Sequence, residues 1–239
     1  MTEIPTLDLG PYLSGDVESR ERLAEKLRRV QEKIGFYAAV NHGVPVEPIE
    51  VAYTALREFF ALPLEEKLKL RIDERSVGYI PAKTTIYVTS KINRNTKPDL
   101  NETLTLARER SADDPAIQQG LRFVGPNQWP GNLPDFRDAM IAYQEALSAL
   151  GYAMLPLYAR ALDLPADYFA PYFTEPMWWT RNTFYPALEP EENQFGISPH
   201  SDHSFITLLP FSDVAGLEIL LPGGTWSPAV PIDGGILVN

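Results

Sequence analysis

Two kinds of hydrophobic pattern follow one another along this sequence, and their order restricts the folds that it can adopt. Before Pro171 the strongest pattern has helical spacing, because apolar residues recur every three or four positions over about 136–157. Beyond Pro171, short apolar segments are separated by Gly, Pro, Asn and Ser, at 178–185, 204–209, 216–221 and 235–239. Several short strands at such spacing are typical of a β-sandwich or barrel. We therefore expect a mixed α/β (α+β) protein in which helices pack on a sandwich or barrel.

The N-terminal part predicts two amphipathic helices and two short strands. Apolar residues at helical spacing indicate helices over about 17–34 and 46–62. Alternation of apolar and polar residues over 4–9 predicts a strand, which we place at a sheet edge because Pro5 cannot donate a ladder hydrogen bond. Residues 36–40 predict a second strand.

The composition argues against several partners and compartments. The net charge of −11 opposes close approach to nucleic acid or to an anionic membrane surface, so we expect neither as a partner. No apolar run approaches the ~18 residues that cross a bilayer, and the N-terminus lacks the basic and apolar regions of a signal peptide. The absence of cysteine excludes thiolate chemistry and agrees with a reducing compartment. We therefore expect a cytoplasmic protein.

The three histidines of the chain limit the chemistry that it can carry: they are His42, His200 and His203. An extended chain places His200 and Asp202 on one face and His203 on the other. One imidazole and one carboxylate then converge, and these are two of the three ligands of the 2-His-1-carboxylate triad that binds iron(II). The His-x-Asp pattern is weak by itself, since a turn or a surface hydrogen bond uses the same residues.

Further segments support the metal hypothesis. Residues 200–209, His-Ser-Asp-His-Ser-Phe-Ile-Thr-Leu-Leu, resemble the metal-binding strand of the isopenicillin N synthase-like oxygenases, which depend on iron(II) and 2-oxoglutarate. The N-terminal region of the same family is similar, in the same order, to Ile4-Pro5-Thr6-Leu7-Asp8-Leu9, to Gly35-Phe36-Tyr37 with Asn41-His42-Gly43-Val44, and to Leu62-Pro63 leading into Glu66-Lys67. Four ordered matches are more specific than any one of them.

The resemblance implies a fold and a domain organisation. The fold is a double-stranded β-helix, or distorted jelly roll, with packed N-terminal and central helices. Residues 1–118 would be the N-terminal non-haem dioxygenase region. Residues 119–239 would contribute the central helix and the N-terminal half of the jelly-roll core, within a single structural unit.

The resemblance also implies a site and a reaction. His200 and Asp202 would be the catalytic pair that binds Fe(II), and Tyr185 and Thr183 would contact 2-oxoglutarate, although many plant members have asparagine where Thr183 stands. The reaction would oxidise a small organic molecule with O2 while 2-oxoglutarate is decarboxylated to succinate. Hydroxylation is the default result, and desaturation and ring closure also occur in the family.

The C-terminal part of the family pattern is missing. The second iron histidine of the family, and the arginine and serine that bind the far carboxylate of 2-oxoglutarate, lie on later strands than this sequence reaches at Asn239. We therefore expect the C-terminal strands and the third iron ligand to be absent, and we expect an incomplete chain.

Arg181 is the only lysine or arginine from Met177 onward. Strand alternation places it on the same inward face as Thr183 and Tyr185. We predict that Arg181 binds a carboxylate of the primary substrate. The alternative is a rim arginine paired with a nearby acid, because burying an arginine without a partner is costly.

Other polar and aromatic residues have a structural interpretation at this point. His42 and His203 are expected to be structural histidines. Tyr79, Tyr87 and Phe205 are expected in the core rather than in a substrate pocket, and the region around Glu102 gives no clear signal.

Two alternatives to a 2-oxoglutarate-dependent oxygenase stay open. One is an iron-dependent oxidase that does not use 2-oxoglutarate. The other is a non-catalytic or fragmentary jelly-roll binding protein without a complete iron site, including a metal-free ligand-binding jelly roll, since a fold alone does not establish a function.

Overall fold

A computed structural model describes residues 4–111, 113–212 and 214–239. The chain forms two compact units, each assembled from several segments. Unit 1 comprises the described residues of Met1–Ile49, Glu145–Pro176 and Ser204–Asn239. Unit 2 comprises those of Glu50–Gln144 and Met177–His203. The domain boundary expected after residue 118 stays a prediction.

The helices of unit 1 agree with the periodicity of the sequence. After α1 (Gly10–Leu13), α2 spans Val17–Lys33, and the side chain of Asp16 caps it by accepting a hydrogen bond from the Glu18 backbone N–H at 3.0 Å. Its apolar face is buried, with Leu27 fully inaccessible to solvent. The predicted helix over 17–34 is confirmed.

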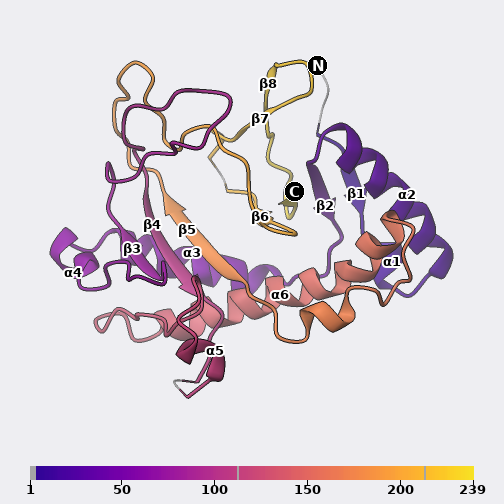
Figure 1. Ribbon diagram of the computed structural model, residues 1–239, viewed down its shortest axis with the longest axis horizontal. Coiled ribbons are helices and arrows are strands. Elements are labelled where there is room, and N and C mark those ends of the chain that lie inside the picture. Colours follow the sequence, from indigo (N-terminus) through magenta and orange to yellow (C-terminus); the bar gives the residue numbers. More distant parts are fainter. Residues whose placement is uncertain (1–3, 112, 213) are drawn as a thin grey trace. The chain divides into compact units, whose positions relative to one another are not determined.

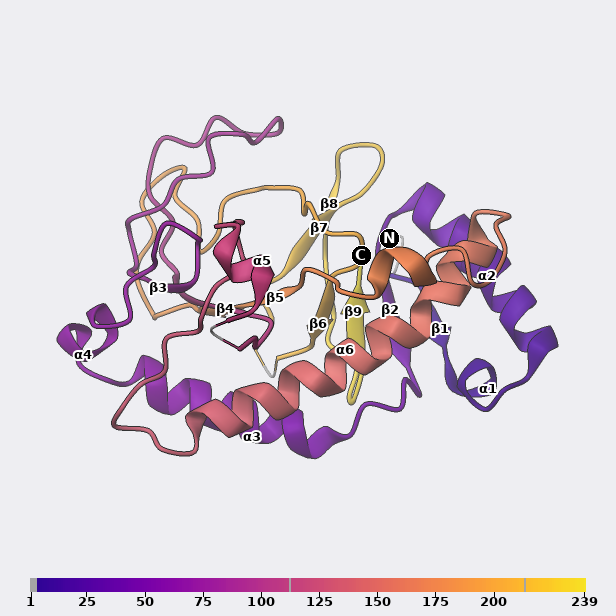
Figure 2. The ribbon, with the colours of Figure 1, turned by 60° about the horizontal axis from the view of Figure 1, so that its bottom comes forward.

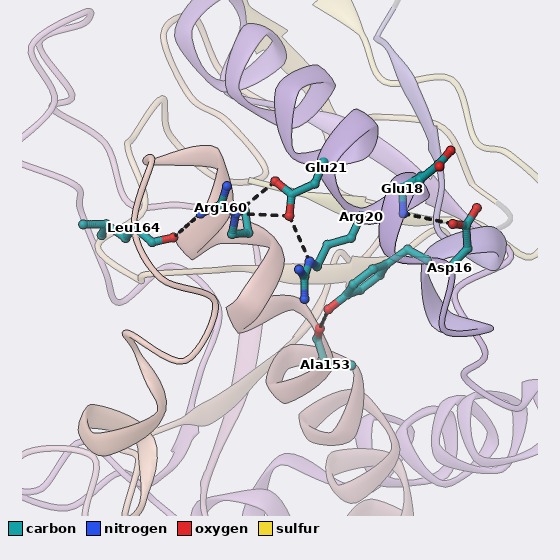
Figure 3. A network of polar contacts seen from close by, with 8 residues as sticks. Asp16, Glu18, Arg20, Glu21, Ala153, Arg160 and Leu164 are labelled. Atoms are coloured by element: carbon teal, nitrogen blue, oxygen red, sulfur yellow. Dashed lines mark hydrogen bonds and ion pairs between the residues drawn. The ribbon is translucent and has the colours of Figure 1, made fainter.

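Polar contacts join α2 to the second half of α6 (Phe136–Ala161) within unit 1 (Figure 3). The Arg160 guanidinium pairs with the Glu21 carboxylate at 2.9 Å, and the Tyr12 hydroxyl donates to the Ala153 carbonyl at 2.5 Å. These bonds attach the N-terminal helices to a helix more than a hundred residues later. The short 3-10 helix η1 (Ala170–Phe173) follows α6.

A four-stranded sheet in unit 1 has the order β1-β2-β9-β6 (Figure 1; β9 is labelled in Figure 2). Its strands are β1 (Thr6–Asp8), β2 (Tyr37–Val40), β9 (Ile236–Val238) and β6 (Leu208–Pro210). Strand β1 runs parallel to β2, and the other pairs are antiparallel. Strand β1 lies at the edge, as Pro5 predicts.

A second layer of unit 1 is the antiparallel pair β7 (Glu218–Leu220) and β8 (Trp226–Pro228). Ile219, Ala229 and Leu237 form a buried cluster that joins this pair to the larger sheet. The strand predicted over 204–209 is correct only at its end, because the ladder of β6 begins at Leu208. Phe205 is 45% exposed, so its placement in the core was wrong.

Unit 2 is built on an antiparallel sheet of the order β3-β4-β5. The strands are β3 (Gly78–Ile80), β4 (Glu102–Ala107) and β5 (Trp179–Phe184), and every residue of β4 is buried. Tyr79 is 1% exposed, which confirms its place in the core. The unit also contains the short helices α4 (Leu64–Leu68) and α5 (Pro115–Gln118).

Helix α3 (Val46–Phe60) confirms the helix predicted over 46–62. Within unit 2 it lies beside the first half of α6, where the Phe59 and Phe136 ring centroids are 5.6 Å apart (Figure 2). No helix in the described part of the chain is long and apolar enough to cross a membrane.

Candidate functional site

The segment that carries His200 is attached to the chain that leads into β4, within unit 2. The Leu100 backbone N–H donates to the Phe195 carbonyl at 2.9 Å, and the Asn101 side chain donates to the Gly196 carbonyl at 2.6 Å. These bonds hold the loop before His200 against the start of a fully buried strand.

His200 and Asp202 converge as the alternation predicts. The His200 Nε2 and Asp202 Oδ1 atoms are 3.6 Å apart. The His200 Nδ1 atom lies 2.8 Å from the Ser198 carbonyl oxygen. Because a carbonyl can only accept, Nδ1 carries a hydrogen, and Nε2 is the ring nitrogen that faces Asp202.

The segment differs from the expected metal-binding strand in one respect. Residues 200–203 form no ladder in the described part of the chain, and regular strand begins only at Leu208. Pro199, next to His200, supplies no backbone N–H for a ladder. A local hydrogen bond to the Ser198 carbonyl, and not a sheet, orients the His200 side chain.

The Tyr87 side chain lies against the His200 imidazole, and not in the core where it was expected. Its ring is stacked on His200, with centroids 4.7 Å apart and an interplanar angle of 22°. The Arg181 guanidinium lies 5.5 Å from the Tyr87 ring centroid and donates a hydrogen bond to the Tyr87 hydroxyl. Tyr87 therefore connects Arg181 to the candidate metal ligand.

Strand β5 presents the other predicted residues. Arg181 and Thr183 share one face, and Arg181 is exposed, whereas Asn182 on the opposite face is 7% exposed and donates to the Leu104 carbonyl at 3.0 Å. The face that was expected to point inward is thus the open one. Among the described residues, no carboxylate lies within 4.0 Å of the Arg181 guanidinium, so the alternative of a rim pair is not observed.

Tyr185 follows β5 and lies against a glycine. A Cβ atom on Gly196 would stand 3.0 Å from Tyr185 Cδ1, so glycine makes room for the ring. The packed surroundings raise the pKa of the Tyr185 hydroxyl, and the charge of Arg181 opposes the shift. Tyr185 is therefore a neutral hydrogen-bond donor, and its relative solvent exposure is 52%.

Asp99 is the buried acid of the site. Its Oδ1 atom accepts hydrogen bonds from the backbone N–H and the hydroxyl of Ser198, at 3.0 and 2.5 Å. Burial raises the pKa of this carboxyl, although the Ser198 bonds and the nearby Arg181 and His200 act in the opposite direction.

The His200–Asp202 pair fits a metal ion as two of its ligands. Metal–nitrogen and metal–oxygen bonds of about 2.0–2.2 Å can span the 3.6 Å between Nε2 and Oδ1. The hydrogen bond at Nδ1 fixes the tautomer in the way that metal-bound histidines require. Within residues 4–111, 113–212 and 214–239, no third His, Cys, Asp or Glu completes a group with this pair.

The other two histidines lie apart from this chemistry. His42 is 8% exposed, accepts from the Val44 backbone N–H at Nδ1 and contacts the Gly234 carbonyl at 2.8 Å through Nε2. This satisfied environment confirms its structural role. His203 is exposed, and its structural role stays a prediction.

Two residues near His200, Asp99 and Tyr87, were not predicted to belong to the site. Asp99 had no local signal, because its partner Ser198 stands 99 positions away. Tyr87 lies in a loop without periodicity, and an aromatic residue there is more often part of a core.

Two family models match the chain. The first, the non-haem dioxygenase in morphine synthesis N-terminal family, matches residues 4–132, more than half of the chain. The second, the 2OG-Fe(II) oxygenase superfamily, matches residues 178–239 and so includes β5 and the His200 segment.

Similar proteins support the same assignment. The 2-oxoglutarate-Fe(II) type oxidoreductase hxnY from Emericella nidulans is 32% identical over 100% of this chain and 69% of its own length. The crystal structure of a full-length Neurospora crassa protein in complex with alpha-KG has a TM-score of 0.83 at 26% identity, covering 99% of this chain and 72% of that one. The structure of JOX2 in complex with 2OG, Fe and JA has a TM-score of 0.76 at 27% identity, covering 100% of this chain and 64% of that one.

These matches establish the jelly-roll fold and the reaction class. Fe(II) is the cofactor and 2-oxoglutarate the cosubstrate, and the protein is an oxidoreductase that oxidises a small molecule. The hypothesis of a 2-oxoglutarate-dependent oxygenase is thereby confirmed. The chain belongs to the isopenicillin N synthase-like family of iron(II)- and 2-oxoglutarate-dependent oxygenases.

Proposed function

We propose that His200 and Asp202 bind the iron(II) of this oxygenase, and that Tyr185 and Thr183 contact 2-oxoglutarate. The primary substrate is a small organic molecule whose carboxylate pairs with Arg181, and hydroxylation of that molecule is the expected outcome. The observation that carries the proposal is the approach of His200 Nε2 to Asp202 Oδ1, at 3.6 Å, with Nδ1 bound to the Ser198 carbonyl.

Bound iron(II) would activate O2, and the decarboxylation of 2-oxoglutarate to succinate and CO2 would supply two of the four electrons that O2 takes up, the hydroxylated substrate supplying the other two. The protein residues position these groups. The Tyr87 ring restricts rotation of the His200 imidazole by stacking on it. The neutral Tyr185 hydroxyl is suited to donate a hydrogen bond to a carboxylate of 2-oxoglutarate.

The orientation of the Arg181 guanidinium supports the proposal that the substrate is an anion. Stacking on Tyr87 and the bond to the Tyr87 hydroxyl orient the guanidinium without neutralising its charge. Its remaining N–H groups can form a bidentate pair with a carboxylate.

Iron binding is tested by anaerobic titration of the chain with Fe(II), with and without 2-oxoglutarate. We expect Fe(II) to bind with the reduced affinity of a site with two protein ligands. Chelation of the iron by 2-oxoglutarate should strengthen this binding, His200→Ala should abolish it, and His203→Ala should leave it unchanged. His203 is a suitable control because it is an exposed histidine three positions away. Equal binding by the wild type and by His200→Ala would contradict the assignment of this ligand.

The role of Arg181 is tested by screening small carboxylic acids and their methyl esters for substrate-dependent succinate release. A charge-assisted hydrogen bond contributes roughly 1.5–3 kcal/mol, so Arg181→Ala should raise the KM for an acid substrate about 10- to 100-fold and leave that of its ester unchanged. The matched control is Arg122→Ala, since Arg122 also stacks on an aromatic ring, that of Phe123, and also bonds a hydroxyl. A change in the KM for 2-oxoglutarate alone would assign Arg181 to the cosubstrate instead.

A further inference from the structure

Asp99 joins two segments that meet at His200. It is fully buried, and its backbone N–H and carbonyl bond to the Thr85 carbonyl and the Lys83 N–H, both at 2.9 Å. Its side chain binds Ser198 through two hydrogen bonds to Oδ1. One residue therefore holds both the segment that leads to Tyr87 and the segment that leads to His200.

The connection from Asp99 to the imidazole has one intermediate. Ser198 receives its orientation from Asp99, and the Ser198 carbonyl in turn accepts the hydrogen of His200 Nδ1 at 2.8 Å. On the other side, Thr85 is two residues before Tyr87, whose ring stacks on His200.

We propose that Asp99 is a positioning residue for His200: acting through Ser198, it holds the imidazole in the Nδ1–H tautomer with Nε2 directed at the metal position. The inference rests on the proposed role of His200 as an iron ligand. It identifies a determinant of metal affinity that does not touch the metal. Removing the direct hydrogen-bond partner of a metal-binding histidine typically lowers metal affinity about 10- to 100-fold, and Asp99 fixes the position of that partner, the Ser198 carbonyl.

Only one oxygen of the carboxylate is needed for this role. The Oδ2 atom of Asp99 is buried and has no hydrogen-bond partner among the described residues. Asp99→Asn keeps a carbonyl oxygen that can accept both Ser198 bonds, whereas Asp99→Ala removes the acceptor. The two variants therefore separate the hydrogen bonds from the negative charge, because Asp99→Asn removes only the charge and Asp99→Ala removes both.

The test measures the tautomer of His200 directly, by ¹⁵N NMR of histidine-labelled chain at about pH 8, above the ordinary imidazole pKa of about 6.5. Only three histidines contribute signals, and His200→Ala assigns the relevant one. The wild type should show a protonated Nδ1 and an unprotonated Nε2. Asp99→Ala should shift the signals toward a mixture of tautomers, and Asp99→Asn should restore the wild-type pattern.

The matched control is Asp114→Ala in the same unit. Asp114 also accepts a backbone N–H bond, from Ala116 at 2.8 Å, but it caps α5 and has no bond to the His200 segment. This variant should leave the His200 signals unchanged. A general loosening of the fold would instead affect both variants.

Metal titration is the second readout, with Fe(II) under anaerobic conditions. Asp99→Ala should lower the affinity about 10- to 100-fold, with a smaller loss for Asp99→Asn. A folded Asp99→Ala with the wild-type tautomer would overturn the inference, even if iron binds at His200. If Asp99→Ala fails to fold, Asp99→Leu decides, since it removes both Ser198 bonds while a side chain still fills the buried position, and a wild-type tautomer in a folded Asp99→Leu would overturn the inference. If the wild-type chain showed the expected His200 tautomer but did not bind iron, the proposed metal site would be contradicted, whereas the role of Asp99 would not.

Discussion

The buried pair Lys67–Glu102 offers a stability prediction with a large expected effect. The Lys67 ammonium is 2.7 Å from Glu102 Oε2 and 3.0 Å from the Phe60 carbonyl, and the Tyr79 hydroxyl donates to the same Glu102 oxygen. The side chains of the pair are only 8% and 10% exposed. Lys67→Met keeps most of the side-chain volume, but it leaves the buried Glu102 carboxylate with the Tyr79 hydroxyl as its hydrogen-bond donor.

Removing one partner of a buried ion pair costs about 3–5 kcal/mol. At about 2–4 °C per kcal/mol for a chain of this size, the melting temperature should fall by about 6–20 °C. Thermal and urea unfolding followed by circular dichroism measure both quantities. The double variant Lys67→Met/Glu102→Gln should lose less than the sum of the single variants, because it no longer buries an unpaired charge.

The control is an exposed pair of the same type. Arg29 and Glu25 lie one helical turn apart in α2, with side chains 53% and 66% exposed. Arg29→Met should cost at most about 0.5 kcal/mol. If Lys67→Met were as mild as this control, the reasoning from burial would be refuted.

Three further predictions concern other parts of the chain. Burial raises the pKa of the Tyr37 and Tyr143 hydroxyls above the ordinary tyrosine value. Their contribution to the free energy of unfolding should therefore be complete below pH about 10 and should be lost as the pH rises further. Tyrosinate absorbance should increase over the same pH range. Gly196→Ala should displace the Tyr185 ring and raise the KM for 2-oxoglutarate while changing the unfolding free energy little; an unchanged KM would count against the proposed contact. Leu27→Ala should cost about 2–5 kcal/mol in urea unfolding, because the side chain is fully buried.

Elements with strong local patterns could be predicted from the sequence. The amphipathic periodicity placed α2 and α3 within two residues of their observed ends, since a helical stripe depends on neighbouring positions only. The edge position of β1 followed from Pro5, which lacks the donor that an inner strand needs.

Elements that depend on distant partners could not be placed in this way. Residues 200–206 have strand-like composition, but in the described part of the chain a ladder forms only from Leu208, where β9 is adjacent. Strand β8 was missed although Gly223 and Gly224, both with positive φ, mark the turn that joins it to β7. That glycine pair was the available signal.

Two buried acids, Asp99 before β4 and Glu102 within it, have partners that a short sequence motif cannot predict. Asp99 and Glu102 stand three positions apart, and their partners Ser198 and Lys67 are 99 and 35 positions away, so no local pattern can pair them. A charge in a buried segment nevertheless requires a partner, because an isolated buried carboxylate is too costly to retain. A carboxylate inside an apolar strand is therefore itself a prediction that a donor lies opposite it. The His-x-Asp motif identifies the atoms suited to bind the metal, whereas buried acids of this kind determine how firmly those atoms are oriented.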